Sequence, residues 1–376
     1  MRCIDFGLAP TSLQELPRLS AMLGEGRRLF VKRDDLLGVG LGGNKIRRFA
    51  YYLGEALDTG CDIVVAGGGA RSNQTIAAAA CAAKAGLPVH LVVPESVGPV
   101  VRKLAELLQA ELHFAESSDA SSLNRTIRAV CQMLKAQGHR PYIVRPGAAG
   151  PLGMLGYVDA MRELYEQAAA CRIEIDHVLC CGGTGTTYGG VLLGTKLFHS
   201  QTTATAVAIG RRFRHAETLC KDIAKAAKLG GYACPVEPTD VQVHFSCGQG
   251  ANCPTVKGRD AMRQMAALEG IFLDPLFTGK AFAGLLEMAI SSYRRCDDSV
   301  GQLLLKTGAR PQYAWSGTCF LSVCGVHSDG LLAGFRREDQ DAAGPGALCV
   351  HLYRYPKSIS KAERLSILHN SFAPLS

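Results

Sequence analysis

The sequence predicts an α/β protein with open parallel sheets flanked by helices. Two observations lead to this prediction. Short apolar runs of strand length alternate along the chain with longer segments of helical periodicity, a pattern typical of parallel sheets buried on both faces. In addition, two glycine-rich loops stand at strand-to-helix junctions, where the backbone needs a tight turn or must approach another molecule closely.

The predicted elements follow one another in order. Strand-like runs occupy residues 61–69, 88–96, 140–147 and 204–210, and helix-like segments occupy 72–87, 98–112 and 152–168. Residues 176–198, "DHVLCCGGTGTTYGGVLLGTKLF", combine a strand, a glycine loop and a helix. Ser72 or Asn73 is the expected N-cap of the helix at 72–87, because such side chains accept the unpaired N–H groups of a first turn.

Bulk composition limits the class of protein. At about 100–200 residues per domain, the 376 residues indicate two domains, and 47% hydrophobic and 20% charged residues are ordinary for a globular chain. The net charge of +8 comes from scattered basic residues with acidic neighbours. Without an aromatic and basic tract, we expect no nucleic-acid partner.

Cysteine usage and the N-terminal sequence predict a cytoplasmic location. The cysteine count, 15, is odd, no C-x-x-C pair occurs, and several cysteines stand in apolar runs, which indicates reduced thiols and no zinc site of paired cysteines. The N-terminus lacks the apolar core of a signal peptide. No uninterrupted apolar run reaches the roughly 18 residues that a membrane helix needs, so we expect no membrane contact.

The first glycine loop leads into a lysine. In "LGVGLGGNKIRRFAYYL", residues 37–53, four glycines precede Lys45 and a helical pattern starts at once. A surface lysine needs no such loop, whereas a lysine that must meet another molecule at close range does. An amine shielded from water can form a Schiff base with an aldehyde.

The second glycine loop, "GGTGTTYGG" at 182–190, follows a strand and opens a helix. Close backbone approach, the N–H groups of a helix start and three threonine hydroxyls suit one phosphate, although a tight turn is the structural alternative. Neither a Walker loop nor a clean dinucleotide fingerprint is present. A cofactor with one aldehyde and one phosphate is pyridoxal 5′-phosphate (PLP), which predicts that cofactor when both loops are taken together.

Five motifs strengthen this prediction. The segments "VKRDDLLGVGLGGNKIRRF", "GGGARSNQTIAAAACAAKAGLPVHLVV", "PGAAGPLGMLGYVDAMREL", "CCGGTGTTYGGVLLGTK" and "LDPLFTGKAFAGL" resemble, in the same order, those of the D-cysteine desulfhydrase and 1-aminocyclopropane-1-carboxylate (ACC) deaminase family. The resemblance covers roughly residues 5–335. It implies the two-domain tryptophan synthase β-like fold (fold type II), with a large PLP-binding domain at 1–48 and 160–376, a small domain inserted at 49–159, and a homodimer.

The resemblance also implies residue roles. Lys45 resembles the lysine that forms the Schiff base and moves the α-proton of the substrate. Asn73 resembles the residue that binds the 3-oxygen of the pyridine, with helix capping as the alternative. The remaining implied contacts are to the substrate carboxylate (Ser72 and Gln74), the phosphate (Gly183, Thr184, Gly185, Thr186 and Thr187) and the pyridine nitrogen (Thr278 and Thr307). An uncharged hydroxyl at that nitrogen suits elimination over transamination. As structural alternatives, Ser72 and Gln74 are ordinary helix-start residues, and Thr278 and Thr307 only end strands.

The sequence departs from the family at the substrate. Phe277 stands where the family has a tyrosine, and a loose alignment places Ala251 at a second tyrosine position. Both changes remove a hydroxyl that can donate a proton. Arg310, after Gly308 and Ala309, adds a possible anion contact. We therefore expect a pocket rebuilt for another small amino acid, since ACC ring opening depends on such groups.

The predicted activity is that of a PLP-dependent lyase. Lys45 takes the α-proton of a small amino acid, the β-substituent leaves, and hydrolysis releases a keto acid and ammonia. Three alternatives stay open at this point: β-replacement by an added nucleophile, racemisation, and PLP binding without catalysis.

Overall fold

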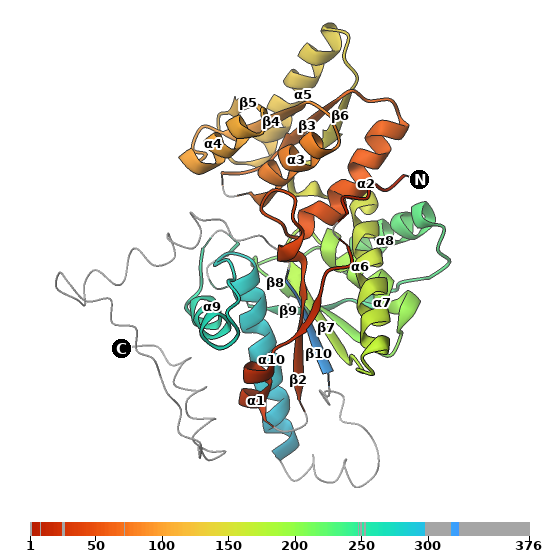
Figure 1. Ribbon diagram of the computed structural model, residues 1–376, viewed down its shortest axis with the longest axis vertical. Helices are drawn as coiled ribbons and strands as arrows, with labels where there is room; N and C mark the ends of the chain where they lie inside the picture. The colour runs from red at the N-terminus through yellow and green to blue at the C-terminus, as the bar shows by residue number, and fades with distance from the viewer. Residues whose placement is uncertain are drawn as a thin grey trace, which may run out of the picture.

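The computed structural model describes residues 2–7, 9–24, 27–70, 72–246, 248, 250, 251, 253–297 and 317–322. Thr307, Arg310 and the tail beyond about residue 336 lie outside these ranges. The described residues form two sheets with helices on both faces of each (Figure 1).

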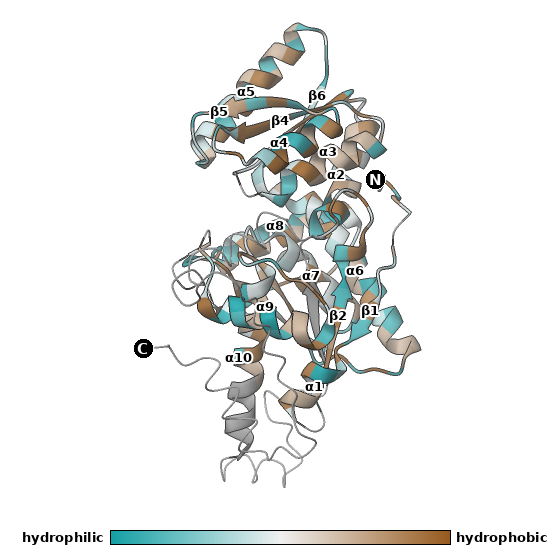
Figure 2. Cartoon of the chain, turned by 60° about the vertical axis from the view of Figure 1, so that its left-hand side comes forward, coloured by the Kyte–Doolittle hydropathy of each residue, from teal (hydrophilic) through white to brown (hydrophobic). Residues whose placement is uncertain are grey.

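The smaller sheet forms the upper unit of Figure 1 and is wholly parallel. Its strands run in the order β5-β4-β3-β6, with β3 at Ile63–Gly67, β4 at Val89–Pro94, β5 at Glu111–Ala115 and β6 at Pro141–Val144. Two helices pack on one face, α3 (Asn73–Lys84) and α4 (Pro99–Leu107), and α5 (Ala120–Ala136) packs on the other. Every residue of β4 is buried, and this strand is mostly brown in Figure 2.

The larger sheet lies in the lower unit of Figure 1, and its strand order is β1-β2-β10-β7-β8-β9. Only the edge strand β1 is antiparallel to its neighbour, β2. The strands are β1 (Leu13–Glu15), β2 (Arg28–Arg33), β7 (His177–Gly182), β8 (Thr203–Ala208), β9 (Gln242–Phe245) and β10 (Gly317–Ser322).

Helices cover both faces of the larger sheet, with α2 (Asn44–Asp58) at the junction of the two units. One side carries α6 (Pro151–Ala170), α7 (Thr186–Phe198) and α8 (Ala216–Gly230), and the other carries α1 (Pro17–Leu23), α9 (Val256–Glu269) and α10 (Thr278–Asp297). Short 3-10 turns are η1 (Asp34–Leu36), η2 (Pro146–Ala148) and η3 (Pro238–Asp240). Of the described helices, none combines the length and the apolar character that spanning a bilayer requires.

Strand β7 is apolar at successive positions because both of its faces are buried. Val178 and Cys180 pack into the core on the α6–α7 side, whereas Leu179 packs with α10 on the opposite side. Because successive side chains point to opposite faces, a strand covered on both faces needs apolar residues at every position. The cysteines whose side chains the structure describes are free thiols, and burial raises the pKa of Cys180 to about 12.

The predicted α/β fold with parallel sheets is confirmed, and one predicted element is wrong. Residues 98–112 were expected to form one helix, but α4 ends at Leu107 and Glu111 already begins β5. Gln109, with φ 53°, reverses the chain between them. The apolar pattern continues across this turn because both α4 and β5 bury residues against the same core, so periodicity alone did not mark the boundary.

Candidate active site

A cavity of about 420 Å³ opens where loops from both sheets meet. Loops that follow β3, β5, β6 and β7 line it, so it lies beyond the carboxyl ends of parallel strands, as ligand sites of open α/β sheets do. Its volume lies within the range of small-molecule sites. The lining residues are Asn44, Lys45, Arg48, Gly69, Ala70, Ser72, Asn73, Ser118, Gly147, Cys181, Gly183, Thr184, Gly185, Thr187, Leu276 and Phe277.

The first glycine loop brings Lys45 to this cavity as the second residue of α2. Gly42 has φ 70°, and a Cβ there would stand 2.3 Å from the carbonyl oxygen of Asp35. The loop can therefore fold back on η1 only with glycine at this position. Gly43 donates its N–H to the carbonyl of Asp34 at 2.8 Å, which fixes the point where the helix begins.

Buried charges hold α2 against the large sheet. The Arg47 guanidinium donates to both carboxylate oxygens of Glu163 on α6, at 2.7 and 2.9 Å, and to Asp34 at 3.0 Å. Lys32 on β2 adds a bond of 2.9 Å to Glu163. Burial opposes the charge on Glu163, but Arg47 and Lys32 outweigh it and lower the pKa of that carboxyl. Lys45 thus lies in the first turn of a helix whose position is set by this ionic network.

The start of α7 offers the cavity an anion site. Gly185, the N-cap with φ 84°, lies in the left-handed region, and no side chain caps the first turn. The hydroxyl of Thr187 accepts a hydrogen bond from Asn44 at 3.1 Å and another from Arg48. Since a hydroxyl has two lone pairs and one proton, both acceptor positions are taken and the proton is left to donate. A helix start, a hydroxyl donor and the adjacent Arg48 cation together favour a phosphate.

Comparison with known proteins identifies the family. Residues 4–300 match the family model described as "Pyridoxal-phosphate dependent enzyme". A Pyrococcus abyssi protein, whose name provisionally assigns it ACC deaminase activity, is 34% identical over 304 residues, 80% of this chain and 89% of that protein. The D-cysteine desulfhydrase of Salmonella typhimurium (strain LT2) is 30% identical over 319 residues, 82% of this chain and 94% of its own. This chain belongs to the pyridoxal-phosphate-dependent enzymes.

A solved structure agrees with this assignment. The crystal structure of an ACC deaminase homologue superimposes with a TM-score of 0.74 at 28% identity, covering 89% of this chain and 95% of the other. The predicted family resemblance and the predicted cofactor are thereby confirmed. The cavity fits the group: the uncapped start of α7 and the Thr187 proton face one part of the same space that Lys45 lines.

The start of α3 forms another wall of the cavity of this PLP enzyme. Ser72 is the N-cap, because its hydroxyl accepts from the N–H of Gln74 at 3.3 Å, and Asn73 begins the helix. Both residues line the cavity. Gln74 does not: its side chain is fully buried and donates to the carbonyl of Arg145 at 2.8 Å. The three residues predicted together therefore separate, with Ser72 and Asn73 at the cavity and Gln74 behind it.

The other predicted residues divide in the same way. Thr186 is buried and accepts from the N–H of Gly150 at 3.3 Å, and it does not line the cavity. Thr278, the first residue of α10, donates its hydroxyl proton to Asp274 and accepts the N–H of Asp274, both at 2.7 Å, so its side chain closes the turn that precedes the helix. Phe277 lines the cavity, whereas Ala251 is exposed and does not.

Sequence reasoning missed two polar residues of the site, Asn44 and Arg48. Both line the cavity and both donate to Thr187. A signal for Arg48 was present, since a residue three positions after Lys45 shares its face of a helix. Two arginines follow Lys45 closely, and the sequence did not show which of them faces the cavity. In the structure Arg47 points away, toward Glu163.

Proposed function

We propose that this chain is a lyase that removes the α-proton of a small amino acid and expels its β-substituent, after which one water hydrolyses the product to a keto acid and ammonia. The observation that carries the proposal is one cavity lined by Lys45, by the phosphate-type loop at Gly183–Thr187 and by the helix start at Ser72 and Asn73. The names of the relatives, a deaminase and a desulfhydrase, point to the same class of reaction.

The residues divide the work by position. Bound PLP supplies an electron-withdrawing ring that makes the Cα–H bond of the substrate acidic. Thr187, supported by Asn44 and Arg48, holds the phosphate, while the start of α3 with Ser72 binds the substrate carboxylate. Asn73, in the same wall, would hold the ring of the cofactor through its 3-oxygen. The Lys45 amine would bind the cofactor covalently and, when free, would accept the α-proton.

Phe277 restricts the substrate. Asp274 accepts the N–H groups of Leu276 and Phe277 at 2.9 and 2.7 Å, which holds this wall of the cavity in place. The phenyl ring gives apolar contact but no proton. We infer that the β-substituent leaves as a stable anion, such as a thiolate, without an acid at this wall. Since the Thr278 hydroxyl proton is committed to Asp274, we propose that Thr278 holds the turn before α10 rather than contacting the pyridine nitrogen.

The test uses purified, PLP-loaded protein with D- and L-cysteine, β-chloroalanine of both hands and ACC. We expect stoichiometric keto acid and ammonia from at least one β-substituted amino acid and no turnover of ACC. Turnover that consumes an added thiol without keto acid would mean β-replacement. Loss of optical activity without any product would mean racemisation, and either result would contradict the proposal.

Removing the Thr187 hydroxyl is expected to weaken cofactor binding. Thr187→Val removes one hydrogen bond to an anion, worth roughly 1.5–3 kcal/mol, so the Kd for PLP should rise about 10- to 100-fold. The change is measured by titrating the apoenzyme with PLP and following its absorbance. Thr195→Val is the matched control, because Thr195 is buried in the same helix, bonds to Tyr165 and does not line the cavity. An unchanged Kd in Thr187→Val would contradict the phosphate role.

Three further statements stay proposals. We propose the division into a large domain at 1–48 and 160–376 and a small domain at 49–159, a cytoplasmic location supported by the free thiols, and a homodimer. Size-exclusion chromatography with light scattering tests the last of these.

A further inference from the structure

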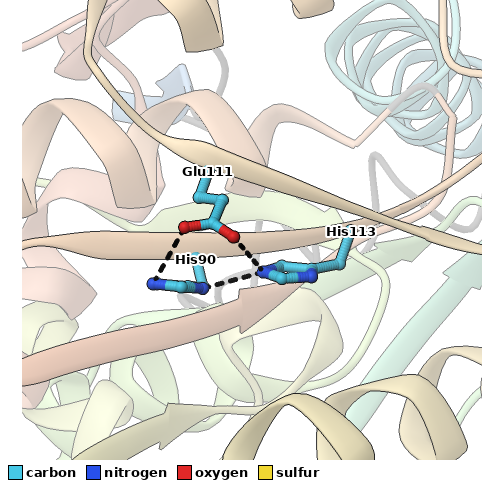
Figure 3. Close-up of side chains that lie close together, drawn as sticks. All are labelled: His90, Glu111 and His113. Carbon is cyan, nitrogen blue, oxygen red and sulfur yellow. Dashed lines mark hydrogen bonds and ion pairs between the residues drawn. The ribbon is translucent and has the colours of Figure 1, made fainter. Parts of the chain in front are cut away.

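Two histidines and a glutamate meet on the smaller sheet (Figure 3), and none of them lines the cavity. His90 on β4 is the register partner of Glu111 on β5, and His113 stands two residues after Glu111. Because side chains on one face recur every second residue, all three point to the same face of the sheet. The His90 Nδ1 and His113 Nε2 atoms are 2.7 Å apart, and each ring has a nitrogen 3.6 Å from a Glu111 oxygen.

The environment keeps both imidazoles ready to act as ligands. His90 is 8% exposed, while the Glu111 side chain is 61% exposed and reaches solvent. The 2.7 Å contact between His90 Nδ1 and His113 Nε2 requires one of these nitrogens to accept through a lone pair, so at least one ring is neutral. The neutral imidazole is the form that binds a metal ion.

We propose that His90, Glu111 and His113 bind one divalent transition-metal ion of the zinc type. One ligand atom from each residue lies within 4.8 Å of the others. Metal bonds of about 2.0–2.1 Å in a tetrahedral site place ligand atoms roughly 3.3 Å apart. The printed contacts use different atoms, since His90 meets Glu111 through Nε2 and His113 through Nδ1, and the two rings meet different Glu111 oxygens. Binding therefore requires the side chains to turn until each directs one atom at a shared ion. Two imidazoles and one carboxylate suit zinc, cobalt, nickel or copper, whereas calcium and magnesium prefer oxygen alone.

The position of this site distinguishes it from the cofactor cavity. His90 and Glu111 stand at the amino ends of β4 and β5, whereas the cavity lies beyond the carboxyl ends of the strands, and none of the three ligands lines it. Strand β5 is an edge strand that pairs only with β4 among the described strands. A metal ion here joins the edge strand to its neighbour, so its role is to stabilise the small sheet, whatever amino acid the cavity takes.

The sequence predicted no zinc site of paired cysteines. Cysteine spacing carries no information about a site made of two histidines and a glutamate. The ligands come from two strands that are separated in sequence by the whole of α4. Only the register of β4 and β5 brings them together.

The experiment titrates the metal-stripped, PLP-loaded full chain with zinc chloride against a chromophoric chelator. We expect the unaltered chain to bind one zinc ion tightly. Glu111→Gln, His90→Asn and His113→Asn should each bind zinc at least ~10-fold more weakly, because losing a ligand lowers metal affinity more than losing an outer-shell contact does. His139→Asn is the control, because His139 pairs with Asp62 at 3.2 Å outside the cluster. Glu111→Gln alters only an exposed side chain, so it keeps the test valid if a histidine variant misfolds.

A second measurement separates this site from zinc bound to thiols. X-ray absorption at the zinc edge should show nitrogen and oxygen neighbours at about 2.0–2.1 Å and no sulfur near 2.3 Å. Zinc should also raise the thermal midpoint of the unaltered chain and of His139→Asn, but not of His113→Asn. Equal zinc affinity in all variants, no tight equivalent, or a sulfur shell would each overturn the proposal and leave the three side chains as a hydrogen-bonded cluster.

Discussion

Lys45→Ala is expected to abolish turnover of every amino acid that the unaltered enzyme converts. The substitution removes both the covalent hold on the cofactor and the base at Cα. A single acid–base group contributes roughly 10²–10⁴-fold, so the rate should fall by at least that factor. Cofactor held through Thr187 and Arg48 should remain, but in exchangeable form. The measurements are keto acid release and the mass of borohydride-treated peptides, which should carry an adduct at Lys45 only in the unaltered chain.

The matched control is Lys103→Ala. Lys103 lies on α4, pairs with Glu106 at 2.8 Å on the surface and does not line the cavity. Its replacement should leave both turnover and the adduct unchanged. A borohydride adduct on a different lysine, or undiminished turnover in Lys45→Ala, would refute the assignment of the reactive amine.

Glu163→Ala is expected to give the largest loss of stability among single substitutions near the site. Glu163 binds Arg47 and Lys32, and the Lys32 side chain is completely buried. Removing one partner of a buried ion pair leaves an uncompensated charge and costs about 3–5 kcal/mol. Because Arg47 lies on the same helix as Lys45, catalytic activity should fall as well. Denaturant unfolding measures the free energy, and activity at subdenaturing concentrations shows the link to the site.

Acid should reduce the difference in the free energy of unfolding between the unaltered chain and Glu163→Ala. The pKa of Glu163 lies below its ordinary value of 4.5 in the folded state, so its contribution is fully present above that pH and is lost as the pH falls through the folded value. As the pH falls below the folded pKa of Glu163, Glu163→Ala and the unaltered chain should therefore converge in stability. Glu166→Ala, an exposed position on the same helix, should change the free energy of unfolding by less than about 0.5 kcal/mol. A constant gap at all pH values would show that the loss is not electrostatic.

Local patterns in the sequence predicted most of the fold and the cofactor. Apolar strand runs, the helix start at Ser72 and the two glycine loops depend on residues close together in the chain. The α/β class and the cofactor were therefore predictable from them, and the structure places Lys45 and the second glycine loop at one cavity. The failure at residues 98–112 has the same origin. A helix and an edge strand that bury residues against one core share an apolar pattern, and only the turn at Gln109 divides them.

Other features depended on contacts between distant segments. The sequence placed Ser72 and Gln74 side by side, but helix geometry turned Gln74 toward Arg145 and left Ser72 at the cavity. The two hydrogen bonds that orient Thr187 come from residues more than a hundred positions earlier, and the His90, Glu111 and His113 cluster depends on strand register. The sequence shows which residues are neighbours along the backbone. These pairings arise only when packing selects one strand register and one helix face, so the folded structure decided them.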